Sequence, residues 1–105
     1  MSSETAKSEY SGMAIGVFEL DSYLECFVAL DAAAKAADVR IQSIERNRLK
    51  SGACVKMRGM VADVNAAMEA ALAMAERRGA KIVSRTVIAS PDEGTELAAQ
   101  MTINK

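Results

Sequence analysis

The 105-residue chain predicts an α+β fold in which two helices cover one face of a four-stranded, antiparallel-containing sheet. Apolar residues recur at helical spacing over residues 22–37 and again over 63–78. Shorter runs rich in strand-forming residues precede, separate and follow these segments. The order is strand, helix, strand, strand, helix, strand, as in a two-layer sandwich. Because 50% of the residues are hydrophobic, one core is expected, in a domain over residues 13–91.

The first strand is expected over residues 13–20, and Ser22 begins the helix that follows it. Ser22 and Glu25 have the spacing of a capping box, which satisfies free N–H groups at a helix start. Asp31 and Lys35 are four residues apart, so we expect them to pair on the helix surface. One broad apolar face is expected in the core: Tyr23, Cys26, Phe27, Leu30, Ala33, Ala34 and Ala37.

Two apolar residues of this first helix lie on its charged face. Leu24 and Val28 stand among acidic and basic residues, on the side opposite the core stripe. A domain of this length has no second core in which to bury them. We therefore expect this face of the helix to contact another protein chain.

The second half of the domain repeats the order of elements. A strand over residues 39–45 changes its alternation near its middle, which indicates a bulge or an early end. The strand over 53–58 alternates between apolar and polar residues, which predicts a half-buried strand. A helix over 63–78 and a β-branched strand over 82–88 complete the domain.

The two ends of the chain are expected to be tails. Residues 1–12 are polar and lack the apolar stretch of a secretory signal. Residues 92–105 form the second tail, with a short helix expected over 93–100.

Composition argues against several classes of function. The net charge of −1 gives no basic field for nucleic acid, and 4% aromatic residues are too few for base stacking. No apolar run approaches the ~20 residues that span a membrane. The chain has no His, the usual acid–base residue and metal ligand, and only two Cys, Cys26 and Cys54. We therefore expect a cytosolic protein with reduced thiols, no cofactor, no metal site and no catalytic residues.

A basic loop joins the second and third strands. It consists of Arg46, Asn47, Arg48, Leu49, Lys50, Ser51 and Gly52. It can be a solvated surface loop, or an anion site in which Ser51 and Gly52 present backbone N–H groups. In a symmetric assembly the same charges would form a positive opening that favours anions.

The segment AIGVFELDSYLECFVALDAAAKAADV resembles the opening of bacterial microcompartment shell proteins of the single-domain, hexamer-forming class, the BMC domain. The later Arg58–Gly59 strand end and the Ala-rich second helix also fit this family. The matching residues of the first segment are Ala14, Gly16, Glu19, Asp31, Ala32, Lys35, Ala36, Ala37 and Val39. The resemblance implies a ferredoxin-like βαββαβ sandwich and a non-enzymatic, structural protein.

The family's known assembly implies roles for particular residues. A homohexamer would tile edge to edge with other shell proteins in the bacterial cytoplasm, around encapsulated enzymes that the tails could bind. The basic loop would line a central pore for small, anionic metabolites. Lys35 matches the family's edge lysine, beside Leu24 and Val28. Before Pro91, where the family often has an edge arginine, this chain has Ser90.

A second class of function remains open from the residues themselves. A ferredoxin-like regulatory domain, dimeric and binding an anion or an amino acid at the basic loop, has the same order of elements. Size in solution distinguishes a hexamer that forms sheets from a dimer that responds to a ligand.

Overall fold

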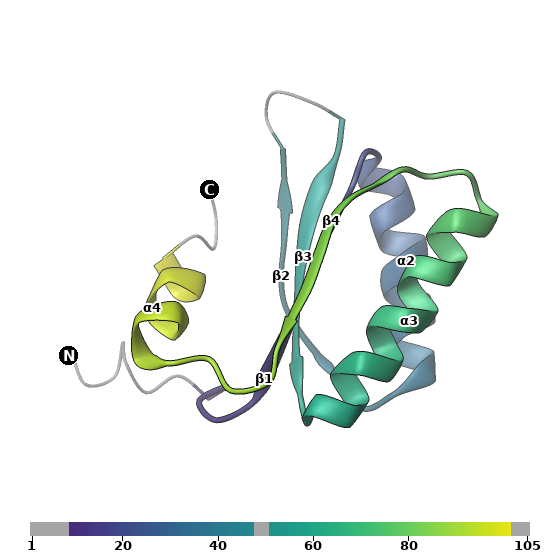
Figure 1. Ribbon diagram of the computed structural model, residues 1–105. Helices are drawn as coiled ribbons and strands as arrows, with labels where there is room; N and C mark the ends of the chain where they lie inside the picture. Colours follow the sequence, from purple (N-terminus) through teal and green to yellow (C-terminus); the bar gives the residue numbers. More distant parts are fainter. Residues whose placement is uncertain (1–8, 48–50, 102–105) are drawn as a thin grey trace.

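The computed structural model describes residues 9–47 and 51–101 and has the predicted order of elements (Figure 1). Four strands form one antiparallel sheet in the order β2-β3-β1-β4. The α+β fold and every predicted helix and strand are confirmed, with ends that differ by at most two residues. The elements are β1 (Ala14–Leu20), α2 (Tyr23–Ala36), β2 (Arg40–Arg46), β3 (Ala53–Gly59), α3 (Val61–Arg77), β4 (Ile82–Ile88) and α4 (Glu93–Met101).

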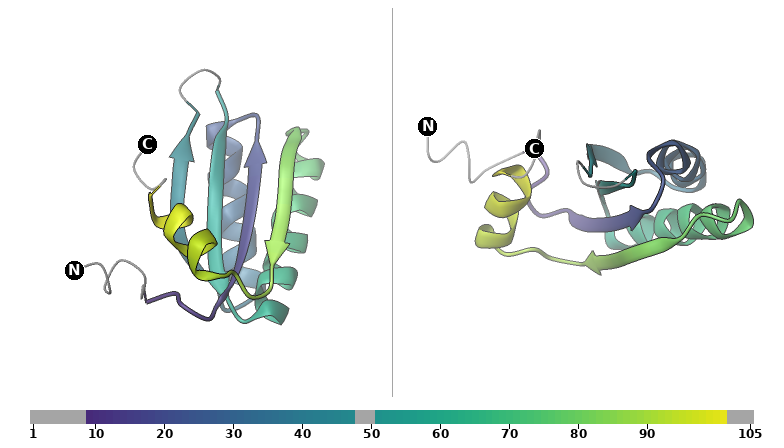
Figure 2. Two further views of the ribbon diagram at one scale, coloured as in Figure 1. Left: turned by 60° about the vertical axis from the view of Figure 1, so that its left-hand side comes forward. Right: turned by 90° about the horizontal axis from the view of Figure 1, so that it is seen from above.

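The helices lie on both sides of the sheet. Helices α2 and α3 cover one face, and the short α4 lies against the other (Figures 1 and 2). The predicted two-layer sandwich is therefore present, and α4 adds a partial third layer. No helix in the described part of the chain is long and apolar enough to cross a membrane.

The main core lies between the sheet and the pair α2 and α3. Small residues bring the helices close to the strands: a Cβ on Gly16 of β1 would lie 2.7 Å from a methyl of Val64 on α3. The fully buried larger side chains of this layer include Phe18, Leu20, Val55 and Met57. The core cluster also contains Ala14, Cys26, Ala29, Ala33, Ala53, Val64, Ala67, Met68, Ala71, Leu72 and Ala75.

Strand β2 contains the irregularity that its sequence predicts. Its register against β3 shifts between Ile41 and Ser43. The shift turns the strand so that both Ile41 and Ile44 pack against the core. A regular strand would place residues three apart on opposite faces.

The prediction that β3 is half-buried is wrong. Lys56 and Arg58, on the polar face, are only 8% and 0% exposed. Helix α4 covers that face, and its Glu96 and the carbonyl of Ala99 bind these two cations. A charged residue is buried in this way only when a partner satisfies it.

The expected core positions of Phe27 and Ala34 on α2 are also wrong, because both residues are exposed. Phe27 is 45% exposed, whereas Cys26, Ala29 and Ala33 are fully buried. These small residues let α2 approach its neighbours closely, and the larger Phe27 lies at the margin of this helix contact.

Candidate functional site

The base of the basic loop is tied to the turn between β1 and α2. The Ser51 hydroxyl donates to the carbonyl of Asp21 over 2.7 Å, and the backbone N–H of Tyr23 donates to the carbonyl of Ser51 over 2.7 Å. The backbone N–H of Asn47 closes the loop by donating to the carbonyl of Gly52 over 2.8 Å. Two segments about 30 residues apart in sequence therefore hold each other at one end of the sheet.

Gly52 is required by close packing. A Cβ at this position would lie 2.3 Å from the carbonyl oxygen of Leu20, nearer than any side chain tolerates. Ser51 and Gly52 thus anchor the loop to the turn between β1 and α2.

The predicted loop residues divide into a base and a tip. Arg46, at the base, is exposed, and its guanidinium lies 4.7 Å from the centre of the Tyr23 ring, a cation–π contact. Arg48, Leu49 and Lys50, at the tip, lie outside the described residues. Four of the seven loop residues are therefore placed, all at the base.

A hollow of about 410 Å³ lies beside the loop base. The charged residues of its lining are Glu19, Asp21 and Lys81. The backbone N–H of Lys81 donates to an Asp21 carboxylate oxygen over 2.9 Å, which ties the start of β4 to this end of the sheet. The other lining residues are Leu20, Asn47, Ser51, Gly52, Ile82 and Val83.

The outer face of α2 carries the predicted assembly residues. Leu24 is 66% exposed, as expected for a residue that meets another chain, whereas Val28 is only partly exposed. Lys35 pairs with Asp31 over 2.8 Å, as predicted, and this hydrogen bond raises the pKa of Lys35. Both side chains of the pair remain largely open to solvent, so Lys35 is accessible to a neighbouring molecule.

Ser90 and Pro91 lie in the short link between β4 and α4. Ser90 is exposed and Pro91 is partly buried. Asp92 caps α4, accepting a hydrogen bond from the backbone N–H of Thr95 over 2.8 Å. This bond holds the pKa of Asp92 below its ordinary value.

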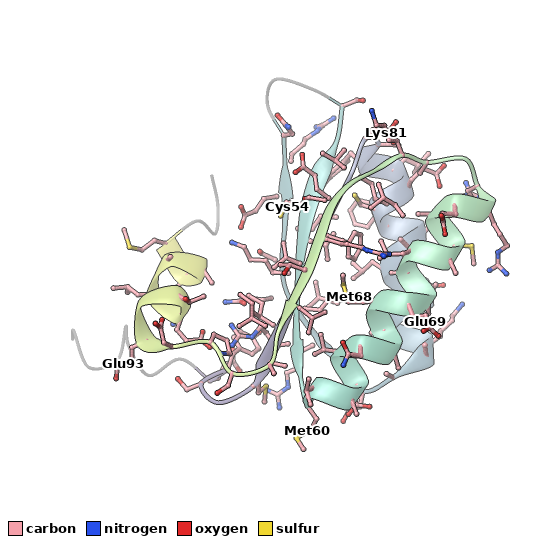
Figure 3. All side chains as sticks on the ribbon, viewed as in Figure 1. Cys54, Met60, Met68, Glu69, Lys81 and Glu93 are labelled. Carbon is pink, nitrogen blue, oxygen red and sulfur yellow. The ribbon has the colours of Figure 1, made fainter. Side chains whose placement is uncertain are left out.

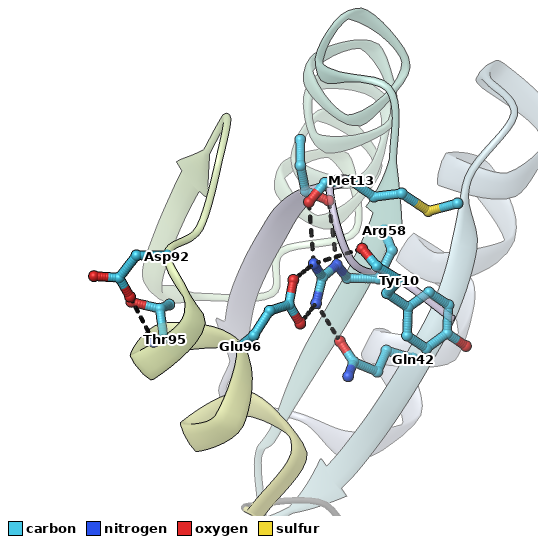
Figure 4. Close-up of polar contacts among 8 residues, drawn as sticks. Tyr10, Met13, Gln42, Arg58, Asp92, Thr95 and Glu96 are labelled. Carbon is cyan, nitrogen blue, oxygen red and sulfur yellow. Dashed lines mark hydrogen bonds and ion pairs between the residues drawn. The ribbon is translucent and has the colours of Figure 1, made fainter. Parts of the chain in front are cut away.

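A buried cluster around Arg58 attaches α4 to the sheet, and the sequence analysis missed it (Figure 4). The Glu96 carboxylate binds the guanidinium through both oxygens, one at 2.9 Å. Arg58 also donates to the Gln42 side chain and to the carbonyls of Tyr10 and Met13. The guanidinium therefore has hydrogen-bond acceptors on all sides, as a buried cation requires. The family resemblance at Arg58 and Gly59 did not indicate that Arg58 pairs with Glu96.

The two thiols are poor nucleophiles in this environment. Cys26 is fully buried and its Sγ donates weakly to the carbonyl of Ala53 over 3.5 Å. Burial raises the pKa of both the Cys26 and Cys54 thiols above the ordinary value. Within residues 9–47 and 51–101, no group of three or more His, Cys, Asp or Glu side chains is arranged to hold a metal ion.

Comparison with known proteins identifies the family. A model described as the BMC domain matches residues 14–91. The carboxysome shell protein CsoS1 of Prochlorococcus marinus (strain MIT 9313) is 37% identical over 92 residues, which cover 87% of this chain and 87% of that protein. The microcompartment shell protein EutK of Salmonella typhimurium is 35% identical over 86 residues, which cover 79% of this chain.

A solved structure shows the same fold. The crystal structure of a microcompartment protein from Desulfitobacterium hafniense DCB superposes with a TM-score of 0.73 at 29% identity and covers 84% of this chain. The chain spans about half of that protein (48%), of EutK (49%) and of the probable carboxysome shell protein CsoS1E of Prochlorococcus marinus (48%).

These findings define the class: a BMC-domain shell protein of bacterial microcompartments. The chain belongs to the BMC domain family. The predicted class is therefore confirmed, and the relatives are named as shell proteins and not as enzymes. Their names also agree with the expected place in a microcompartment shell inside the bacterial cytoplasm.

Proposed function

We propose that this protein forms cyclic homohexamers that tile, with other shell proteins, into the facet of a bacterial microcompartment, and that its basic loop lines a central pore. The match of the BMC domain across residues 14–91 carries this proposal. Small metabolites, chiefly anions, cross the shell through this pore to reach encapsulated enzymes.

The anchored loop base supports the pore. Hydrogen bonds to Asp21 and Tyr23 hold Ser51 in place, so the described part of the loop is fixed at one end of the sheet. Its sequence contributes Arg46, Arg48 and Lys50 to each chain. Repeated around a symmetry axis, these charges would create a positive potential that favours anions.

The contacts between hexamers are assigned to the exposed end of α2 and to the link after β4. Lys35 would lie across the edge, with Ser90 and Pro91 nearby and Val28 beside the contact. The exposed apolar residues of α4, Leu97 and Met101, are available to encapsulated enzymes on that face of the shell.

Assembly is tested by size in solution followed by imaging. Light scattering coupled to gel filtration should give six chains per particle, and electron microscopy at higher protein concentration should show flat hexagonal sheets. A dimer that changes size with an added anion or amino acid would instead support the ferredoxin-like regulatory domain.

The pore is tested by replacing both tip cations, Arg48→Gln with Lys50→Gln. Reconstituted shells should then pass a small anion more slowly, while the flux of a neutral solute of the same size is unchanged. The matched control removes two cations elsewhere, Arg40→Gln with Arg77→Gln. Equal anion flux through all three shells would show that other residues set the permeability.

A further inference from the structure

One flank of the domain carries an exposed apolar ridge. Phe27 and Leu24 are neighbours on α2 and are 45% and 66% exposed. Glu25 faces α3, because it binds Arg78 there over 3.2 Å. Phe27 follows Glu25 by about 200° around the helix, so it points away from α3, toward the side of strand β2.

A cation stands beside this ridge. Arg46, at the end of β2, lies over the ring of Tyr23, which itself packs edge-on against Phe27 with ring centres 5.1 Å apart. No carboxylate pairs with Arg46 in the described part of the chain. The flank thus presents two apolar side chains and one available positive charge.

The opposite flank has the complementary features. The hollow beside the loop base opens next to Val83 of the edge strand β4, and Val83 is 51% exposed. Glu19 lines this hollow, is partly buried, and has no hydrogen bond or ion pair to its carboxylate within the described residues. An apolar side chain and an unpaired negative charge therefore lie together here.

The two flanks cannot meet within one chain. Strands β2 and β4 are the two edges of the sheet, separated by β3 and β1, or about 14 Å at the usual strand spacing. Both flanks nevertheless lie at the end of the sheet that bears the basic loop, where Figure 3 also places Lys81. A ring of identical chains joins two unlike surfaces of each chain, head to tail.

We propose that Leu24 and Phe27 of one protomer pack against Val83 of the next, and that Arg46 pairs there with the partner's Glu19. This contact rests on the proposed ring. It places Leu24 inside the hexamer beside the pore, in contrast to the hexamer edge that its sequence position suggests, and leaves Lys35 at the edge. The ring contact also completes the wall of the hollow with residues from two chains.

A charge-exchange experiment tests the pair. Arg46→Glu and Glu19→Lys each place like charges together and should weaken the ring about tenfold or more, giving smaller species on gel filtration. The double variant Arg46→Glu with Glu19→Lys should restore the hexamer, because the two charges are exchanged. Circular dichroism checks that each variant is folded.

The apolar half of the contact is tested separately, so that a folding defect at Glu19 does not decide the result. Phe27→Ser should also dissociate the ring, since Phe27 is exposed in the single chain. Met60→Ser is the matched control: Met60 is 74% exposed and lies at the far end of the sheet (Figure 3).

The outcomes separate this inference from the proposed function. A wild-type protein that forms no ring overturns both. A wild-type ring that survives Phe27→Ser and gains nothing from the charge exchange overturns the contact alone. Rescue by the double variant, with dissociation by Phe27→Ser but not by Met60→Ser, supports it.

Discussion

Removing the Glu96 carboxylate should release α4 from the sheet while the rest of the domain stays folded. Glu96 is 3% exposed and binds the guanidinium of Arg58, which is 0% exposed. Breaking one partner of a buried ion pair costs about 3–5 kcal/mol when the other charge remains buried. Arg58 can avoid that penalty only if the helix moves away and water reaches it.

The loss in the free energy of unfolding caused by Glu96→Ala is therefore limited by the free energy with which α4 docks on the sheet. The helix has nine residues and buries only Glu96 and Ala99, a small interface beside the main core. We expect the free energy of unfolding to fall by about 2–3 kcal/mol, below the full penalty, because undocking hydrates the guanidinium. Glu96→Gln keeps the shape and one acceptor, and should cost about half as much.

The assay combines urea denaturation with amide hydrogen exchange. In Glu96→Ala, amides in the second half of α4 should exchange at rates near those of an unfolded peptide, whereas amides of β1 and β3 remain protected. Glu93→Ala, an exposed change in the first turn of the same helix, is the control and should leave both regions protected. Unchanged α4 protection, with stability within about 0.5 kcal/mol of the wild type, would show that the ion pair does not hold α4 on the sheet.

Three further predictions concern the loop base, the edge and the helix pair. Gly52→Ala places a methyl against the backbone of Leu20 and should lower the free energy of unfolding, measured in urea, by about 1–3 kcal/mol. Gly94→Ala is the control and should not destabilise the protein, because a methyl there makes only ordinary contacts. Equal losses of stability in the two variants would contradict the packing argument. Lys35→Ala should leave the hexamer intact by light scattering but suppress sheets in electron micrographs; normal sheets would remove Lys35 from the edge. The hydrogen bond from Arg78, which caps the end of α3, lowers the pKa of Glu25 from its ordinary 4.5. The stability from this pair is therefore complete above that value and is lost as the pH falls through the lowered pKa. Glu25→Gln should therefore flatten the acid end of the stability profile measured by thermal unfolding, and an unchanged profile would show that the pair contributes nothing.

The order and ends of the elements could be predicted because they depend on local patterns. The Ser22 cap, the pairing of Asp31 with Lys35 and the irregularity after Ile41 each involve residues within a few positions of one another. The same residue spacing produces the same local interaction in any protein, so the sequence indicates such interactions without knowledge of the fold. The family resemblance rests on the same ordered segments, and the BMC domain match confirms it.

The wrong predictions concern how a side chain is oriented relative to distant elements. Helical periodicity identified an apolar face on α2. It did not show that Ala29 and Ala33 lie at the centre of the buried face and that Phe27 is exposed. The reason is that the depth of helix packing depends on the surface it meets, here the sheet and α3.

The elements of this protein, its core and its membership of the shell-protein family follow from patterns in the sequence. Which charges are paired depends on the tertiary fold. Arg58 binds Glu96, 38 residues away, while Arg46 and Glu19 have no charged partner in the described chain. Spacing along a sequence does not specify contacts that the sheet creates between distant segments. Pairing over such distances depends on the geometry of the whole fold, because Coulomb attraction and hydrogen bonding act only between groups that the fold brings together.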